Sequence, residues 1–119
     1  MKPIRRILLV LDPSLSRSAA FARARAFARK TQASLWLGLF DPGPRLGTFG
    51  LLGRAQAHRI EQMMRDQMSA RLEELSNELA ADGLDVHTID DRGTVCATRI
   101  LERAGKEQID LIIKDVGHE

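Results

Sequence analysis

The chain has 119 residues, which is typical of one domain, and its hydrophobic share of 44% is enough to build a core without disulfides or metals. No apolar run approaches the roughly 20 residues of a membrane span. The single cysteine, Cys96, excludes an internal disulfide and agrees with a reducing compartment. The basic and apolar N-terminus is too short for a secretory signal, so we expect a cytoplasmic protein with no membrane association.

The net charge of +2 hides an asymmetry. Residues 1–30 contain eight Lys and Arg against the single acid Asp12, a balance of +7, so the remainder carries −5. This basic segment could attract a nucleotide, a nucleic acid or an acidic partner. The alternative is a solvated helix face.

The first predicted strand runs from Ile4 to Leu11 and ends in five consecutive apolar residues, a pattern typical of a strand buried on both faces. Pro13 then forces a turn, and Ser14 or Ser16 can cap a following helix. Asp12 stands at the carboxyl end of this strand, where open parallel sheets bind ligands. It is therefore a candidate ligand-binding residue, and the alternative is a turn residue that hydrogen-bonds its own backbone.

A helix is predicted from Ser16 to about Thr31, with its apolar residues at spacings of three and four. A second buried strand follows from Ser34 to Phe40, in which Trp36 is expected to pack in the core or at a sheet edge rather than stack on a ligand. Asp41 to Gly53 holds two prolines and four glycines and predicts a loop. The glycine spacing from Gly47 to Gly53 resembles a phosphate loop, but no Lys-Ser or Lys-Thr pair follows it, which favours a mobile connection.

A long helix is predicted from Arg54 to Ala81, ended by Gly83 in a left-handed conformation. Its apolar residues recur at steps of three and four: Ile60, Met63, Met64, Met68, Leu72, Leu75 and Leu79. We expect these residues to pack in the core. The alternative is that the methionines face a partner, because methionine adapts to irregular surfaces.

The last third of the chain predicts two strands and a helix between them. Leu84 to Ile89 alternates like an edge strand, and Asp90 to Gly93 is expected to turn. Thr94 is expected to cap a short helix that ends near Gly105, and Ile109 to Ile113 is expected to be a fully buried strand. Strands and helices thus alternate along the whole chain, which predicts a parallel sheet sandwiched by helices.

Other candidate sites have weaker patterns. Cys96 lies near a helix N-terminus, which favours a thiolate, but a small buried residue is the alternative we prefer. The three histidines share no ligand spacing, so no metal site is predicted: His58, His87 and His118. Four acids lack a calcium-loop pattern and are expected on the solvated surface: Asp82, Asp85, Asp90 and Asp91. No nucleophile, base and acid can be assembled, so we predict no catalytic residue and no enzyme, leaving weak ATP hydrolysis open.

Five stretches, taken in order, resemble the universal stress protein family over almost the whole chain: ILLVLDPS, LWLGLFD, the long helix, DRGTVCATRILERA and IDLII. The resemblance rests on their order and spacing rather than on one motif. It implies an α/β three-layer sandwich with a doubly wound parallel sheet, in strand order 3-2-1-4. Family members commonly have a fifth strand and often dimerise through the last one. We expect residues 1–119 to form one such domain without the final helix and fifth strand, resembling the first domain of a tandem universal stress protein.

Many universal stress proteins bind ATP. The resemblance implies that nucleotide would contact the acid after the first strand, Asp12, and backbone near the end of the second, roughly Leu39. The family holds the triphosphate with Gly-x2-Gly-x9-Gly-Ser/Thr after the fourth strand, because glycine lets backbone N–H groups close around phosphate oxygens. Here the first of these glycines would fall near Asp115, whose negative charge repels phosphate, and Gly117 lies two positions further on.

The sequence therefore predicts a stress-response module with a regulatory or binding role and degenerate or absent nucleotide binding, ATP being the one cofactor considered. Its partner would be a second copy, forming a homodimer, or a second universal stress domain with intact glycines. The apolar fourth strand would offer an edge for such pairing. One alternative is an ATP-binding member whose phosphate-binding glycines lie outside this chain. A further alternative is a nucleic-acid-associated protein that uses the basic N-terminal face.

Overall fold

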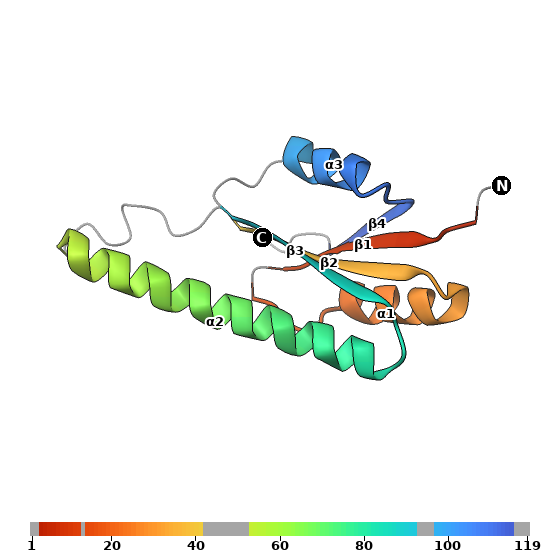
Figure 1. Ribbon diagram of the computed structural model, residues 1–119, viewed down its shortest axis with the longest axis horizontal. Coiled ribbons are helices and arrows are strands. Elements are labelled where there is room, and N and C mark those ends of the chain that lie inside the picture. The colour runs from red at the N-terminus through yellow and green to blue at the C-terminus, as the bar shows by residue number, and fades with distance from the viewer. Residues whose placement is uncertain (1–2, 13, 42–52, 93–96, 116–119) are drawn as a thin grey trace.

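The computed structural model describes residues 3–12, 14–41, 53–92 and 97–115, in which strands and helices alternate (Figure 1). The strands are β1 (Arg6–Val10), β2 (Ser34–Asp41), β3 (Val86–Arg92) and β4 (Leu111–Lys114). The helices are α1 (Ala19–Thr31), α2 (Arg54–Ala81) and α3 (Ala97–Lys106). All paired strands are parallel, in the order β3-β2-β1-β4, which confirms the predicted doubly wound α/β sheet and its strand order.

The sheet lies between two layers of helices, with α1 and α2 on one face and α3 on the other (Figure 1). Successive strand residues point to opposite faces. Ile7 and Leu9 of β1 therefore pack towards α1 and α2, while Leu8 and Val10 pack towards α3. All four are at most 5% exposed, so the expectation of a strand buried on both faces is confirmed.

Helix α1 begins later than predicted, at Ala19 rather than Ser16. The expected caps Ser14 and Ser16 were wrong, because Ser18 is the N-cap and its hydroxyl accepts a hydrogen bond from the backbone N–H of Phe21. The reason lies upstream. Leu15 is buried in the core with a φ of 51°, so the chain is still turning where we expected the helix to start.

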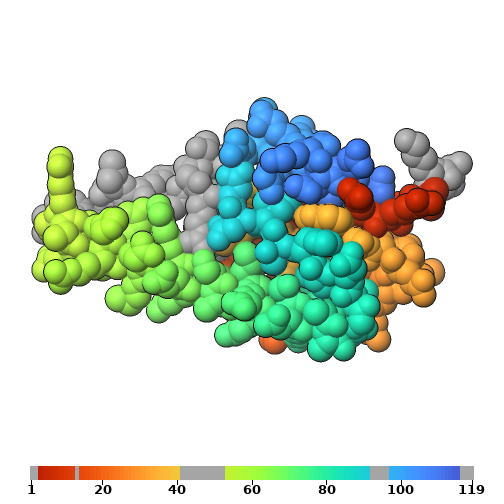
Figure 2. All heavy atoms as spheres, in the orientation of Figure 1, coloured from red at the N-terminus to blue at the C-terminus, as the bar shows by residue number. Residues whose placement is uncertain are grey.

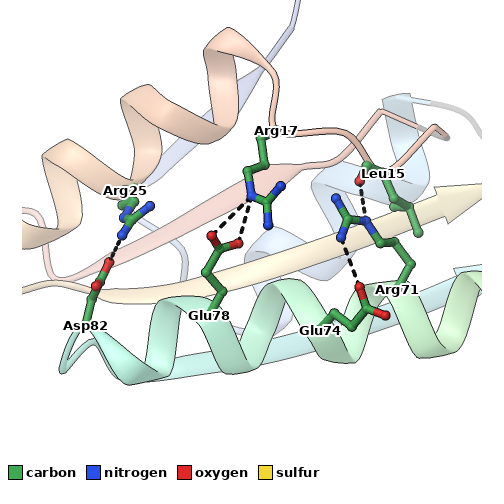
Figure 3. A network of polar contacts seen from close by, with 7 residues as sticks. All are labelled: Leu15, Arg17, Arg25, Arg71, Glu74, Glu78 and Asp82. Carbon is green, nitrogen blue, oxygen red and sulfur yellow. Dashed lines mark hydrogen bonds and ion pairs between the residues drawn. The ribbon is translucent and has the colours of Figure 1, made fainter.

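Arginines tie α1 and the turn before it to the C-terminal half of α2 (Figure 3). Arg17 Nε lies 3.0 Å from a carboxylate oxygen of Glu78, and Arg25 pairs with Asp82. Arg71 Nε donates a hydrogen bond of 3.1 Å to the carbonyl of Leu15. Part of the basic N-terminal segment is thus neutralised by two acids at the C-terminal end of α2, Glu78 and its C-cap Asp82.

The boundaries of β2 and β3 differ from our expectations. We expected Asp41 to open a loop and Asp90 to begin a turn, but both belong to strands. Each strand is longer than expected because the other continues beside it: Leu39 pairs with Asp90 and Phe40 with Asp91 in the parallel ladder. The predicted position of β3 at an edge of the sheet is confirmed within the described residues.

The prediction of a fully buried final strand was wrong. β4 begins at Leu111 rather than Ile109, and its residues alternate between half-buried and exposed. Ile112 is 37% exposed. β4 pairs with β1 along one side, and among the described residues no strand pairs with its other side.

Core packing was predicted wrongly for two methionines of α2, since Met63 is 57% and Met64 41% exposed, whereas Met68 is half-buried and packs against the core as predicted. The buried residues of this helix lie near its C-terminus: Leu72, Leu75 and Leu79. At standard rises the 28 residues of α2 extend about 42 Å, whereas the 8 residues of β2 extend about 27 Å. The N-terminal half of α2 consequently projects past the carboxyl ends of the strands (Figure 1).

Gly83 has a φ of +86° directly after the C-cap of α2, as predicted for a left-handed helix end.

Several other predictions fall outside the described residues: those on Pro13, the Gly47–Gly50 spacing, Thr94, Cys96, Gly117 and His118. Within the described part of the chain, every helix is too short or too polar to traverse a lipid bilayer.

Candidate site at the carboxyl edge of the sheet

The carboxyl ends of β1 and β4 meet where the strand order reverses. β1 is followed by a crossover towards β2 on one side, and β4 lies on its other side, with Val10 paired to Lys114. In open α/β sheets this position is the usual place for a ligand. Asp12 and Asp115 follow these two strand ends, so each of the neighbouring strands ends in a carboxylate.

Asp12 is exposed and makes local contacts. Its carboxylate accepts a hydrogen bond from the Ser14 hydroxyl, and its backbone carbonyl accepts one of 2.8 Å from the N–H of Leu15. These contacts are the ones expected of a turn residue before a helix. They leave the ligand role of Asp12 as a prediction.

Asp115 makes a long-range contact that bears on anion binding. Its Oδ1 accepts a hydrogen bond of 2.9 Å from the backbone N–H of Ala20, in the first turn of α1. The first N–H groups of a helix have no partner within the helix, and they carry a partial positive charge that attracts anions. A carboxylate of the chain itself therefore occupies an anion position at the reversal point of the sheet.

Leu39, the second residue implied by the resemblance, has a fully buried side chain on the α1 and α2 face of the sheet. Only its backbone is therefore available to a ligand. Leu39 lies just beyond the last backbone hydrogen bond between β1 and β2, in which the N–H of Leu11 donates to the carbonyl of Gly38 over 2.8 Å. From this point on, β2 continues beside β3 alone. A nucleotide contact at Leu39 stays a prediction.

The neighbouring carboxyl end of β3 adds further negative charge. Asp90 is exposed at this end, and Asp91 pairs with Arg99 of α3 at 2.7 Å. The two other acids that we grouped with them lie before β3 instead: Asp82 is the C-cap of α2, and Asp85 directly precedes the first residue of β3. Among the described residues, no three His, Cys, Asp or Glu side chains come close enough together to hold a metal ion.

At the opposite edge, the predicted core packing of Trp36 is confirmed by its exposure of 8%. The sequence did not reveal that His87 of β3 stacks on it, with ring centroids 4.4 Å apart. Asp85 lies beside this stack, and the hydrogen bond from the Ser34 hydroxyl, followed by that with His87, lowers the pKa of its carboxyl below the ordinary 3.8. The stack follows from the pairing of Trp36 with His87 in adjacent strands.

The Asp115 contact is the feature of the site that sequence patterns missed. The two signals that could have found it are an acid directly after the fourth strand and the adjacency of that strand to β1, whose following helix is α1. Asp12, Leu39 and Asp115 thus come from three neighbouring strand ends, but only Asp115 reaches a helix N-terminus in the described structure.

No protein-family model matches this sequence, and no curated protein matches it either. Solved structures do match. The fold is similar to that of the universal stress protein UspA from Lactobacillus plantarum, with a TM-score of 0.70 and 17% identity over 100% of this chain and 81% of that one. It is similar to a universal stress family protein from Burkholderia pseudomallei, with a TM-score of 0.66 and 16% identity over 98% and 84% of the two chains.

A third similar structure, a universal stress protein from Archaeoglobus fulgidus, has a TM-score of 0.56 and 18% identity over 90% of this chain and 31% of that longer one. The chain therefore has the fold of the universal stress proteins, as the sequence resemblance implied.

Proposed function

We propose that this chain is a universal stress protein domain that serves the stress response as a regulatory or binding module, with degenerate or absent nucleotide binding. The fold shared with universal stress proteins supports the family assignment. The single observation that supports the loss of nucleotide binding is the hydrogen bond from Ala20 N–H to the Asp115 carboxylate.

That contact opposes a triphosphate in two ways. The carboxylate takes up a helix N–H that phosphate oxygens could otherwise use. Its negative charge, together with that of Asp12 on the next strand, also repels an anion at this edge of the sheet. ATP would therefore meet two carboxylates where it needs backbone donors and positive charge.

Isothermal titration with Mg-ATP tests this proposal on the protein as it is. We expect no saturable heat from the wild-type chain. The variant Asp115→Gly removes the carboxylate, whereas Asp12→Gly removes the other acid and leaves the Ala20 contact in place. Saturable, magnesium-dependent binding by the wild-type chain would refute the proposal and favour an intact ATP site.

The partner we propose is another universal stress domain, either a second copy or a domain that keeps the phosphate-binding glycines. The outer edge of β4 supports this, because β4 is the last strand of the described sheet and an unpaired strand edge can pair with another chain. Ile112, which is 37% exposed, lies on this outermost strand. The substitution Ile112→Lys should abolish pairing through this edge without disturbing α1 or α2. Unchanged self-association of that variant would remove β4 from the interface.

We propose a cytoplasmic, non-catalytic role. Ser14 donates to Asp12 at the candidate site, but His87 stacks on Trp36 at the opposite edge and His58 lies on α2. The base that activates a serine is most often a histidine, and a carboxylate such as that of Asp12 is a much weaker base for a hydroxyl. Sustained turnover of ATP by the wild-type chain, lost on Ser14→Ala, would contradict this part of the proposal.

A further inference from the structure

One apolar stripe runs along the whole of α2. Its residues follow each other at steps of three and four: Ala57, Ile60, Met64, Met68, Leu72, Leu75 and Leu79. Residues at these spacings share one face of a helix. The C-terminal part of the stripe is buried against the sheet, so the N-terminal part continues the same face beyond it.

The N-terminal part of the stripe is much less covered. No residue between Arg54 and Arg71 is fully buried, and Met64 is 41% exposed within this face. Met68 marks the end of this part, because it is half-buried and one side of it packs against the core. Figure 2 shows this half of α2, in yellow-green, projecting from the body of the molecule. Most helical stability in proteins comes from packing of an amphipathic face, so a face of this kind favours a partner.

The charges beside the stripe favour a second copy of the chain as that partner. Glu61 and Arg65 border the stripe and form an ion pair of 3.0 Å within the helix. If two copies of α2 pack antiparallel with Ile60 opposite Met64, Ala57 of each copy meets Met68 of the other. Glu61 of each copy then lies beside Arg65 of the other, so two equivalent Glu61–Arg65 ion pairs form across the interface.

We propose that the stripe formed by Ala57, Ile60, Met64 and Met68 is a self-association surface through which two copies of this chain pack α2 antiparallel. The surface is distinct from the edge of β4, and it depends neither on nucleotide binding nor on the family assignment. The contact covers only about three helical turns, so it is small for a protein interface, and we expect an association that varies with concentration.

Sedimentation velocity over a wide concentration range tests the proposal with a matched pair of variants. Met64→Glu places a charge inside the stripe and should weaken self-association at least about tenfold. Met63→Glu makes the same change one residue earlier, on a side chain that is more exposed but rotated about 100° around the helix, and should leave association unchanged. A concentration-independent monomer, or equal effects of the two substitutions, would overturn the proposal.

A charge exchange tests the antiparallel arrangement. Glu61→Arg and Arg65→Glu should each weaken association, because each places like charges side by side across the interface. The double variant restores opposite charges and should recover it. Failure of the double variant to recover, while thermal unfolding of the variants stays the same, would contradict the arrangement.

The variant Ile112→Lys separates this proposal from the one made for β4. The two surfaces can act together, so α2 is tested in the Ile112→Lys background, where pairing through β4 is removed. Association should remain in Ile112→Lys and be lost when Met64→Glu is added. A monomeric Ile112→Lys variant, or equal association with and without Met64→Glu in this background, would refute the α2 surface. Both outcomes are independent of the Mg-ATP titration, so failure of either proposal can be recognised separately.

Discussion

The backbone N–H of Ala20 donates a hydrogen bond of 2.9 Å to the carboxylate of Asp115, 95 positions further along the chain. The contact joins the end of β4 to the start of α1 across the point where the strand order reverses. It places a negative charge of the protein where a nucleotide-binding α/β domain would offer backbone donors to phosphate. The proposed loss of nucleotide binding depends on this relationship.

The same contact should contribute to stability. Asp115→Ala removes both a hydrogen bond and a favourable charge at the N-terminus of α1, so we expect a loss of about 0.5–2 kcal/mol in the free energy of unfolding. Asp115→Asn keeps an oxygen acceptor and loses only the charge, and should cost less. Urea unfolding of the two variants measures the difference, and an Asp115→Ala variant as stable as wild type would show that the contact does not persist in solution.

Gly38 should tolerate no side chain. A Cβ at this position would lie 2.6 Å from the Phe40 ring and 3.0 Å from Leu8, and both of these side chains are buried. We expect Gly38→Ala to destabilise the protein by about 1–3 kcal/mol, through overpacking on the α3 face.

Gly105→Ala is the matched control for this substitution. A Cβ there meets nothing within 4 Å, and the residue lies within α3, where alanine is favoured. We expect this variant to gain about 0.5–1 kcal/mol. Thermal unfolding compares the two, and a stabilised Gly38→Ala would show that Phe40 moves aside without cost.

The lowered pKa of Asp85 predicts a small dependence of stability on pH. The folded carboxyl has the lower pKa, so its contacts stabilise the fold above the ordinary carboxyl range, and this contribution is lost as the pH falls through the lowered pKa. The group is exposed, so we expect less than about 1 kcal/mol. Ser34→Ala removes the hydrogen bond that lowers the pKa of Asp85 most. In this variant the free energy of unfolding should therefore fall less steeply as the pH is lowered. The same dependence on acid pH in Ser34→Ala and wild type would contradict this role of the Ser34 hydrogen bond.

Local patterns predicted the elements and their order because each strand and helix has its own periodicity. The apolar residues of β1 and the small residues of α1 lie where the patterns placed them, with Ala24 and Ala28 fully buried against the sheet. The alternation of strands and helices was sufficient for the parallel sheet, since parallel strands need a crossover between them.

The features that the sequence did not predict are set by partners distant in the chain. β3 continues to Arg92 because β2 continues beside it to Asp41, which no local pattern shows. Met64 has the spacing of a core residue and is exposed because the sheet ends before α2 does. For the candidate site, position alone predicted Asp12 as a strand-end acid. The hydrogen bond from the N–H of Ala20 in α1 to Asp115 could be recognised only in the tertiary structure.

A crystal structure determined from crystals grown with Mg-ATP tests the central claim most directly. We predict that Asp115 Oδ1 stays within hydrogen-bond distance of Ala20 N and that no ordered triphosphate lies at the carboxyl ends of β1 and β4. An ordered triphosphate held there by this chain, with the Asp115 carboxylate displaced from α1, would contradict the account.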